Sequence, residues 1–509
     1  MPFYFEFPEK VAKSKQVYDC EKCGQYLNKK LKHPKMTNPF MGNQYNGLVI
    51  VADSPSAEED ESGIPLSGEL TKKIRSQALM NGINFASEAA ITFAACCGKT
   101  SKDVSYTCCK PILEKNLSLL KPKMIIALGE YAFKSIMNLK NKYSALEIRN
   151  RFVPNYNFNC AVFPVLNPNK AFSYHYKDSI EKDLKRAYSF WKDRFHKRTE
   201  VVKFLKERKI LENIKIVEVK KSEIKETFDR IKQLKEVALD YETTGNKPYD
   251  KWFEVTHITF SIGKLAWVFH ESLWENDLEV WDSLIAPNMV DILTNDSILK
   301  IIQNSKFEDI VSRFLFGIKE IGNVFCTMLA THTIDERTGC TSLDFQNLVR
   351  FGIPPYSDTV KSHLQKKEKN DFINTIRKAP HRDLIQYAGL DGITTFANYR
   401  VLNDVLLPNA YPKARENYEF LLKGHKVFAN MSCRGIAIDG DYFEKLDGII
   451  LSNMERIANE IKSDSKVMEF NELLRSEQKP KKKTKNTEKI LMDFNDNKPL
   501  KRKLKPAIE

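Results

Sequence analysis

Acidic side chains recur at the ends of predicted elements in the second half of the chain. Asp240 and Glu242 lie two residues apart at the end of a predicted strand, so both side chains project from one face of it. Glu308 follows another predicted strand and falls in the first turn of the next helix, with Asp309 as the neighbouring candidate if the register differs by one. We therefore expect carboxylates from separate segments to converge.

A phenol and a further carboxylate, Tyr387 and Asp391, lie four residues apart and share one face of a predicted helix. Clustered carboxylates repel one another unless hard cations neutralise them, and oxygen ligands suit Mg²⁺ or Mn²⁺. Two such ions roughly 3.5–4 Å apart activate a water and stabilise the leaving oxygen in phosphodiester cleavage. Any one of these acids alone is more simply a solvated residue or a helix cap, but their order and spacing together favour a metal site.

Paired thiols indicate a second metal centre in the first part of the chain. Cys20 and Cys23 have the spacing of paired ligands, and two adjacent pairs follow at 96–97 and 108–109. Four thiolates from this set can hold either Zn²⁺ or a [4Fe–4S] cluster. The first residues lack the apolar core of a signal peptide, so we expect the ten cysteines to be free thiols or metal ligands rather than disulfides.

Three compositional blocks must position these groups. Residues 1–205 hold seven of the ten cysteines and contain two short aliphatic segments, 47–52 and 124–129, that are typical of buried parallel strands. Residues 210–405 begin with predicted strands and continue mostly as helices, which indicates a mixed sheet flanked by helices. Residues 412–509 are predicted to be helical and become increasingly basic.

The charge balance favours a polyanionic partner. Lysine and arginine total 80 against 66 acidic residues, which gives a net charge of +14. Segments 479–485 and 501–503 are strongly basic and have few apolar residues, which is typical of a mobile arm that contacts nucleic acid. No apolar run approaches the roughly 18 residues that span a bilayer, so we expect no membrane partner.

The acidic segments resemble the proofreading 3′→5′ exonucleases of the ribonuclease-H-like superfamily, of the type with tyrosine in the third motif. Segments 237–245, 303–308 and 387–391 are similar to the three motifs, with Glu308 where the family usually has Asp. The resemblance implies that Tyr387 orients the attacking water. It implies two Mg²⁺ or Mn²⁺ ions held by Asp240, Glu242, Glu308 and Asp391.

Two further features belong to the same resemblance. In the second motif we expect Asn304 and Lys306 to bind the substrate. Cys326-Thr327 stands where the family often has Asp-Thr. We expect this difference to affect the support of the site rather than its metals.

The first block resembles the iron–sulfur uracil-DNA glycosylases. Segment 51–68 is similar to their first motif, and segment 120–129 is similar to their central strand. The resemblance implies a [4Fe–4S] cluster, with zinc as the alternative metal. Its ligand positions fall on Cys20, Cys23, Cys97 and Cys109.

The positions of the glycosylase active site carry unsuitable residues. Phe93 stands where the family has the Asn that reads uracil, and Asn167-Pro168 replaces a His-Pro pair. Asp53 and Ser56 replace residues of a more glycine-rich loop. A site without the polar side chain that hydrogen-bonds uracil loses most of its selectivity for that base. We therefore predict a glycosylase-like fold without uracil excision, which acts as a DNA-binding or architectural module.

Segment 421–439 resembles the segment that opens the polymerase region of family A DNA polymerases, just before the thumb. No motif of the palm or fingers follows it, so nucleotide incorporation is not assigned to these 509 residues. The order of the parts resembles the N-terminal portion of bacteriophage family A polymerases, which implies the cytoplasm of a bacterial host cell. One half of a split polymerase, a separate exonuclease and a fragment all fit this order.

These features predict an α/β chain of three parts. We expect a three-layer uracil-DNA glycosylase-like domain over 1–205 and a ribonuclease-H-like exonuclease domain, with a mixed sheet flanked by helices, over 210–405. A thumb-like helical region with a basic tail is expected over 412–509. The leading hypothesis is a metal-dependent 3′→5′ DNA exonuclease that acts on a single-stranded 3′ end or a primer–template. The alternatives are a non-catalytic DNA-binding subunit that joins a separate polymerase chain, and an RNA-trimming exonuclease.

Overall fold

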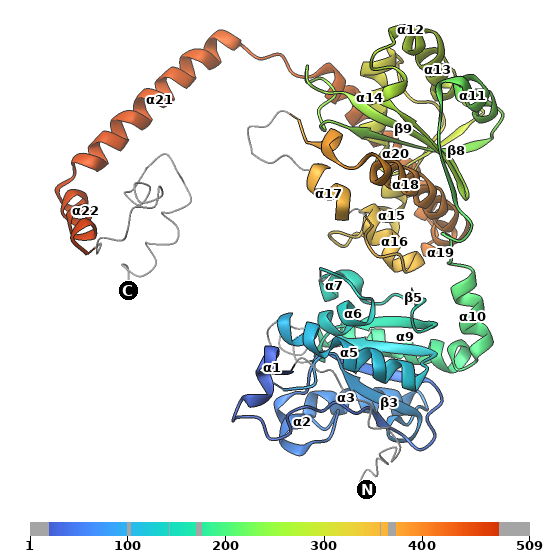
Figure 1. Cartoon of the computed structure of the whole chain (residues 1–509), viewed down its shortest axis with the longest axis vertical. Helices are drawn as coiled ribbons and strands as arrows, with labels where there is room; N and C mark the ends of the chain where they lie inside the picture. The colour runs from blue at the N-terminus through green and yellow to red at the C-terminus, as the bar shows by residue number, and fades with distance from the viewer. Residues whose placement is uncertain are drawn as a thin grey trace. The chain divides into compact units, whose positions relative to one another are not determined.

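The computed structural model describes residues 20–98, 103–141, 143–168, 176–356, 358–364 and 373–477. Contacts along the chain divide it into two units, Met1–Cys433 and Arg434–Glu509, whose elements are labelled in Figure 1. The predicted basic segments at 479–485 and 501–503 lie outside the described residues. Among the helices that are described, none is long and apolar enough to cross a membrane.

A six-stranded sheet with the order β1-β3-β2-β4-β6-β5 forms the centre of the first part of the chain. Its inner strands are parallel: β3 (Ala89–Phe93), β2 (Leu48–Ala52), β4 (Met124–Leu128) and β6 (Cys160–Val165). Two short antiparallel strands form its edges: β1 (Phe40–Met41) and β5 (Val153–Asn155). Parallel strands covered on both faces need apolar residues throughout. Both segments predicted as buried strands therefore lie at the centre of this sheet.

Helices cover both faces of the first sheet. One face packs against α3 (Glu69–Met80) and α9 (Lys177–Phe190), and the other against α5 (Asp103–Leu120) and α6 (Glu130–Ile136). The predicted three-layer α/β architecture is therefore confirmed. Helix α10 (Arg198–Lys206) follows and leads toward the second sheet.

The second six-stranded sheet has the order β12-β11-β8-β9-β10-β7 and is mixed, as predicted. Strand β9 pairs antiparallel with β8 on one side and with β10 on the other. Strand β7 pairs in parallel with β10, and β11 pairs in parallel with both β8 and β12. The strand bounds are β7 Lys215–Glu218, β8 Glu236–Thr243, β9 Val255–Ile262, β10 Leu265–His270, β11 Leu299–Ile302 and β12 Val324–Cys326. The long strand β8 lies inside the sheet, so groups on it are held by neighbours on both sides.

The two faces of β8 have different partners. Val237, Leu239 and Tyr241 join an apolar cluster with α11 (Ile224–Lys232) and α13 (Ala286–Thr294). Side chains alternate along a strand, so Asp240 and Glu242 face the opposite side, where α18 (His381–Val401) lies across β8 and β9 (Figure 1). A Cβ atom on Gly392 of α18 would lie 3.0 Å from Thr259 Cγ2 on β9, so glycine permits this close approach.

The remaining helices of the first unit surround the second sheet. Helix α14 (Ser305–Phe316) follows β11, and α15 (Thr327–Ile334) follows β12. Further along the chain are α16 (Leu343–Phe351), α17 (Asp358–Leu364) and α20 (Ala414–Arg434). The backbone N–H of Cys326, at the end of β12, donates a hydrogen bond to Tyr418 Oη on α20 (2.8 Å), which ties α20 to β12.

Residues of the second sheet's helices also join the core of the first domain. Phe345 and Leu348 of α16 belong to the apolar cluster that includes Val153 of β5 and Val162 of β6. A Cβ atom on Gly352 would lie 2.2 Å from the carbonyl oxygen of Pro154, so only glycine fits at this contact.

Charged groups border the same contact. Arg151 forms an ion pair with Asp335, and Arg337 donates to the carbonyl oxygens of Leu146 and Arg149 at 2.9 and 3.1 Å. The contact between the two domains of this unit is therefore apolar at its centre and ionic at its margin.

The second unit consists, in its described part, of α21 (Gly440–Ser463) and α22 (Ser465–Glu477). None of the residues of α21 is buried. Its apolar side chains include Phe443, Ile450 and Met454, which are 52%, 46% and 59% exposed. This unit has an amphipathic helix whose apolar side chains are exposed.

Candidate functional site

Three predicted acids meet between β8 and α18. Asp240 and Glu242 come from β8, and Asp391 comes from the middle of α18. One carboxylate oxygen from each lies within 4.8 Å of the others. Among the described residues, no other group of three histidine, cysteine or acidic side chains is as close together.

The fourth predicted acid, Glu308, comes from the first turn of α14 and is 4% exposed. Its Oε2 atom has no hydrogen-bond partner within the described chain. Its neighbour Asp309 pairs with Arg313 at 2.7 Å and accepts a hydrogen bond from the backbone N–H of Ile321 at 2.9 Å. Asp309 is thus engaged by these two partners, whereas Glu308 carries the unpartnered oxygen.

The acids perturb one another strongly. Desolvation, followed by the charges of Glu242, Asp391 and Glu308, raises the pKa of Asp240 well above its usual value. Desolvation and the charges of Asp391 and Glu308 raise the pKa of Glu242 in the same way. Burial raises the pKa of Glu308 to about 8. Crowding makes these carboxyl groups harder to ionise. All of them are ionised together only when a bound cation offsets their mutual repulsion.

Two tyrosines hold Asp391. Tyr356 donates to its Oδ1 atom at 2.5 Å, and Tyr387 also forms a hydrogen bond with it. The two rings lie 6.2 Å apart between centroids. Burial raises the pKa of Asp391 to about 7, while these two hydrogen bonds lower it. Tyr387 was predicted to lie here, but Tyr356 was missed, because nothing in its spacing connects it with Asp391.

The two predicted substrate-binding residues lie on different sides of α14. Asn304 is half-buried at the N-terminal end of the helix. Lys306 lines a small cavity with His425 of α20, on the helix face that also carries Asp309 and Arg313. Glu308 lies on the opposite helix face, at 100° per residue. The structure therefore places Lys306 away from the acids.

Thr327, which follows β12 at the start of α15, holds the segment before α14 in place. Thr327, next to Cys326, donates to Gln303 Oε1 at 2.5 Å and lies 3.3 Å from the carbonyl oxygen of Ile302. Both partners precede α14, so this contact fixes the turn that presents Glu308. Cys326 itself is fully buried.

The predicted thiols line one enclosed cavity in the first domain. Cys20 and Cys23 come from α1 (Cys20–Cys23), and the other thiols follow β3 or lie on α5. The cysteines around the cavity are Cys20, Cys23, Cys96, Cys97, Cys108 and Cys109. Among the described residues no three of these sulfur atoms lie within 4.8 Å of one another. A tetrahedral zinc site with Zn–S bonds near 2.3 Å needs sulfurs about 3.8 Å apart.

Burial and hydrogen bonding divide the thiols. Burial raises the pKa of Cys97 to about 11. A hydrogen bond from Cys96 lowers the pKa of Cys109 to about 7. Metal ligation requires thiolates. Of Cys97 and Cys109, Cys109 is therefore the one that more readily forms the thiolate.

The residues at the positions of the glycosylase active site contact other groups of the same domain. Phe93 is 1% exposed and belongs to the apolar core beside β3. Asp53 accepts hydrogen bonds from the backbone N–H of Ala132 at 2.8 Å and from Asn167 Nδ2 at 3.0 Å. Ser56 caps the N-terminus of α2 (Ala57–Ser62). The residues in the positions of the glycosylase active site therefore serve the packing of the loop.

Two family models match the chain. Residues 39–192 match the uracil DNA glycosylase superfamily, and residues 216–407 match a 3′-5′ exonuclease family. These matches confirm the predicted succession of a glycosylase-like and an exonuclease domain.

The chain is also similar to individual proteins and solved structures. The chain is 28% identical over 130 residues to a type-4 uracil-DNA glycosylase of Pyrobaculum aerophilum, which covers 25% of this chain and 63% of that protein. It is 27% identical over 191 residues to DNA polymerase I of Rhizobium leguminosarum, which covers 37% of this chain and 18% of that protein. The structure of Brucella melitensis NrnC with bound Mg²⁺ aligns with 40% of this chain and 90% of its own at 22% identity, with a TM-score of 0.30. The chain thus joins a domain of the uracil DNA glycosylase superfamily to a 3′-5′ exonuclease domain related to that of DNA polymerase I.

Proposed function

We propose that this chain is a metal-dependent 3′→5′ DNA exonuclease that hydrolyses terminal phosphodiesters in proofreading. The observation that carries the proposal is the convergence of Asp240, Glu242 and Asp391 within 4.8 Å, beside the unpartnered oxygen of Glu308. Acids this close are fully ionised together only when cations neutralise them, and otherwise hold protons. The match of residues 216–407 to a 3′-5′ exonuclease family supports the same chemistry.

The donor set fits hard divalent ions, which we take to be two Mg²⁺ or Mn²⁺. Asp240, Glu242, Glu308 and Asp391 would hold them. When bound, such ions supply an activated water and charge stabilisation at the leaving oxygen. Carboxylates supply only oxygen atoms, and no soft ligand lies in this group.

The chain's own residues orient the reactants. Tyr387 lies beside Asp391 on α18 and presents the phenol that we assign to the attacking water. Tyr356 holds Asp391 from another direction and so restricts the rotation of its carboxylate. Asn304 precedes Glu308 at the start of α14, where it can contact the terminal nucleotide.

A nuclease assay tests the proposal. The wild type should remove 3′ nucleotides from DNA when Mg²⁺ or Mn²⁺ is added, and the double variant Asp240→Ala/Glu242→Ala should not. Matched DNA and RNA oligomers distinguish proofreading from RNA trimming, since we expect DNA to be degraded faster. Equal rates for the double variant and the wild type would exclude the assignment.

We further propose that the thiol cavity holds a [4Fe–4S] cluster, with Cys20, Cys23, Cys97 and Cys109 as ligands. Six thiols, including these four, line one cavity, and type-4 uracil-DNA glycosylases are among the relatives. Protein purified without oxygen should contain iron and sulfide and absorb visible light. A colourless protein that contains one zinc per chain would exclude the cluster.

For the glycosylase-like domain we propose an architectural, DNA-binding role without uracil excision. Phe93 is buried in the core and has no polar group for a flipped base, and the side-chain amide of Asn167 donates to Asp53 within the protein. Uracil-containing DNA incubated with the protein should gain no abasic sites. Efficient formation of abasic sites would contradict this role.

The partner that we propose is a separate polymerase chain in the cytoplasm of a bacterial host cell. The exposed apolar side chains of α21 supply a surface for it. Primer extension should require the added polymerase, and the two chains should migrate together in gel filtration. Separate migration at micromolar concentration would contradict the partnership.

A further inference from the structure

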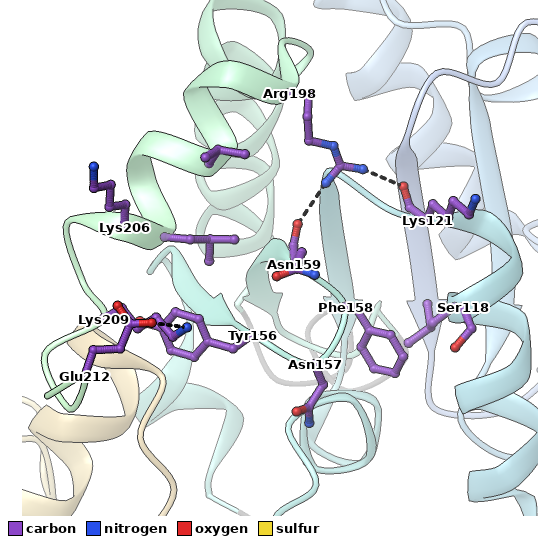
Figure 2. A pocket seen from close by; sticks show the side chains of 13 residues that line it. Ser118, Lys121, Tyr156, Asn157, Phe158, Asn159, Arg198, Lys206, Lys209 and Glu212 are labelled. Carbon is purple, nitrogen blue, oxygen red and sulfur yellow. Dashed lines mark hydrogen bonds and ion pairs between the residues drawn. The ribbon is translucent and has the colours of Figure 1, made fainter.

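A basic hollow on the first domain lies apart from both metal centres. It has a volume of about 890 Å³ and is lined by the end of α5, the turn between β5 and β6, and α10 with the turn after it (Figure 2). Lys121 precedes β4 and Asn159 precedes β6. The hollow therefore lies at the amino ends of the parallel strands, whereas the loop of Asp53 follows the carboxyl end of β2.

The hollow carries an excess of positive charge. Its charged residues are Lys121, Arg198, Lys206, Lys209 and Glu212. Lys209 and Glu212 pair at 2.7 Å, and neither Lys121 nor Lys206 has an acidic partner within the described chain. Figure 2 shows Lys121 and Lys206 at opposite margins of the hollow, with their side chains extended outward. Exposed lysines at two separate margins suit successive anionic groups that pass over the hollow.

Two aromatic rings lie between the lysines. Tyr156 and Phe158 belong to the turn between β5 and β6 and are both half-buried (Figure 2). Tyr156 Oη is shielded from solvent and has no hydrogen-bond partner among the described residues. A buried phenol without a partner is costly unless a ligand or an ordered water supplies one. The rings therefore offer flat apolar faces together with one unused polar atom.

The backbone at the rim is strained. Lys121 and Asn159 are not glycine, yet their φ angles are +47° and +48°. Arg198 donates to the carbonyl oxygens of both residues, at 3.0 and 2.9 Å, and so holds the two segments in place. Residues other than glycine seldom adopt this left-handed conformation, and those that do tend to occur at ligand sites.

We propose that this hollow binds a segment of single-stranded nucleic acid, with Lys121 and Lys206 each contacting a different phosphate at opposite margins and a base against Phe158 or Tyr156. An unpaired strand presents phosphates and free base faces together, whereas a duplex hides the base faces by stacking. This site is separate from the acid cluster and its binding does not require cleavage.

Binding of a fluorescent oligothymidylate to the full chain, measured by anisotropy with a metal chelator present, tests the proposal. Replacing two phosphate contacts in Lys121→Gln/Lys206→Gln should reduce the slope of log affinity against log salt by about 1.4. The matched control, Lys203→Gln/Lys182→Gln, removes the same charge from exposed positions outside the hollow. Equal salt slopes for both double variants would overturn the proposal.

The base contact has its own test. Phe158→Leu keeps apolar bulk but removes the aromatic face, so it should weaken oligothymidylate binding about five-fold or more. The same variant should bind an abasic sugar–phosphate oligomer as the wild type does. An equal loss for both oligomers would overturn the assignment of Phe158 to the base.

Two further measurements are needed. One distinguishes a free nucleotide from a strand as the ligand, and the other distinguishes the hollow from the acid cluster. Thymidine monophosphate should compete only weakly with the oligomer, and strong binding of the monophosphate without oligomer binding would overturn the strand proposal. Cleavage of a dinucleotide should be unchanged in Lys121→Gln/Lys206→Gln. Failure of the hollow is thereby distinguishable from failure of the exonuclease assignment.

Discussion

The exonuclease and glycosylase-like domains both place polar residues at the ends of buried strands, but they satisfy those residues differently. Glu308 keeps an unpartnered oxygen among the described residues, and it raises the pKa values of neighbouring acids. Asp53 instead accepts hydrogen bonds from Ala132 and Asn167. A buried polar group without a partner costs free energy unless a ligand supplies one. The proposed metal site of the exonuclease domain thus contains a buried oxygen without a partner among the described residues, whereas the polar groups of the glycosylase-like loop bond to one another.

The largest expected effect follows from neutralising an acid of the proposed metal site. Asp240→Asn should reduce exonuclease activity on the order of 10³-fold, because charge stabilisation of the transition state is lost. In chelator the same variant should unfold at a higher denaturant concentration, since a repulsive charge is removed. Nuclease rates and denaturant titrations check both parts, with the exposed Asp282→Asn as control. A destabilised Asp240→Asn protein would contradict the contrast between the two domains.

Removing the tyrosine hydroxyls should have the next largest effect. Tyr387→Phe and Tyr356→Phe should each lower exonuclease activity roughly 10–100-fold, because groups that orient a metal ligand commonly contribute this much. Tyr387→Phe should lower kcat alone, and Tyr356→Phe should also raise the Mg²⁺ concentration needed for half-maximal activity. Tyr399→Phe on the same helix, which loses a hydrogen bond to Glu236, is the control. Unchanged metal dependence in Tyr356→Phe would remove that residue from the site.

The closed loop should respond in the opposite way. Asp53→Ala removes the acceptor of two hydrogen bonds, so it should lower the free energy of unfolding by about 2 kcal/mol. Exonuclease activity of the folded protein should not change. Denaturant titration and the nuclease assay measure the two effects, with the exposed Glu61→Ala as control. A loss of activity without a loss of stability would show that the loop has a functional role.

The smallest effect concerns the ionic margin between the two domains. Burial opposes the ionisation of Asp335, but the hydrogen bonds and charges of Arg337 and Arg151 lower its pKa to about 2. Since this is below the unfolded value of about 3.9, the stabilisation is complete above pH 4 and is lost as the pH falls toward 2. The difference in unfolding free energy between wild type and Asp335→Asn should be about 1 kcal/mol smaller at pH 3 than at pH 7. Equal differences in unfolding free energy at the two pH values would show that the contacts with Arg337 and Arg151 do not lower the pKa of Asp335.

The sequence allowed the strands and the acids to be predicted because each has a local signal. Buried parallel strands need continuous aliphatic residues, and segments 47–52 and 124–129 have them. The spacing of Asp240 and Glu242 was enough to place both on one strand face. The spacing alone does not distinguish Glu308 from Asp309, because the partners of Asp309 are Arg313, one turn further along the helix, and the backbone of Ile321 beyond the helix end.

Other features arise only from tertiary contacts. Tyr356 reaches Asp391 from a loop 35 residues away. Lys306 faces α20 because that helix packs against α14, which no spacing in the second motif indicates. The basic hollow combines three separate segments, and its lysines are ordinary surface residues when each is considered alone.

The apolar contact of α16 determines where this chain can be cut. Phe345 and Leu348 are almost completely buried in a cluster whose other members belong to the first sheet and its helices. A protein that ends near residue 205 would lack both side chains and would expose the surface that they cover, at a cost of roughly 1.5–3 kcal/mol for each. The glycosylase-like domain expressed alone should therefore be poorly soluble, and residues 343–352 supplied in trans as a peptide should bind to it.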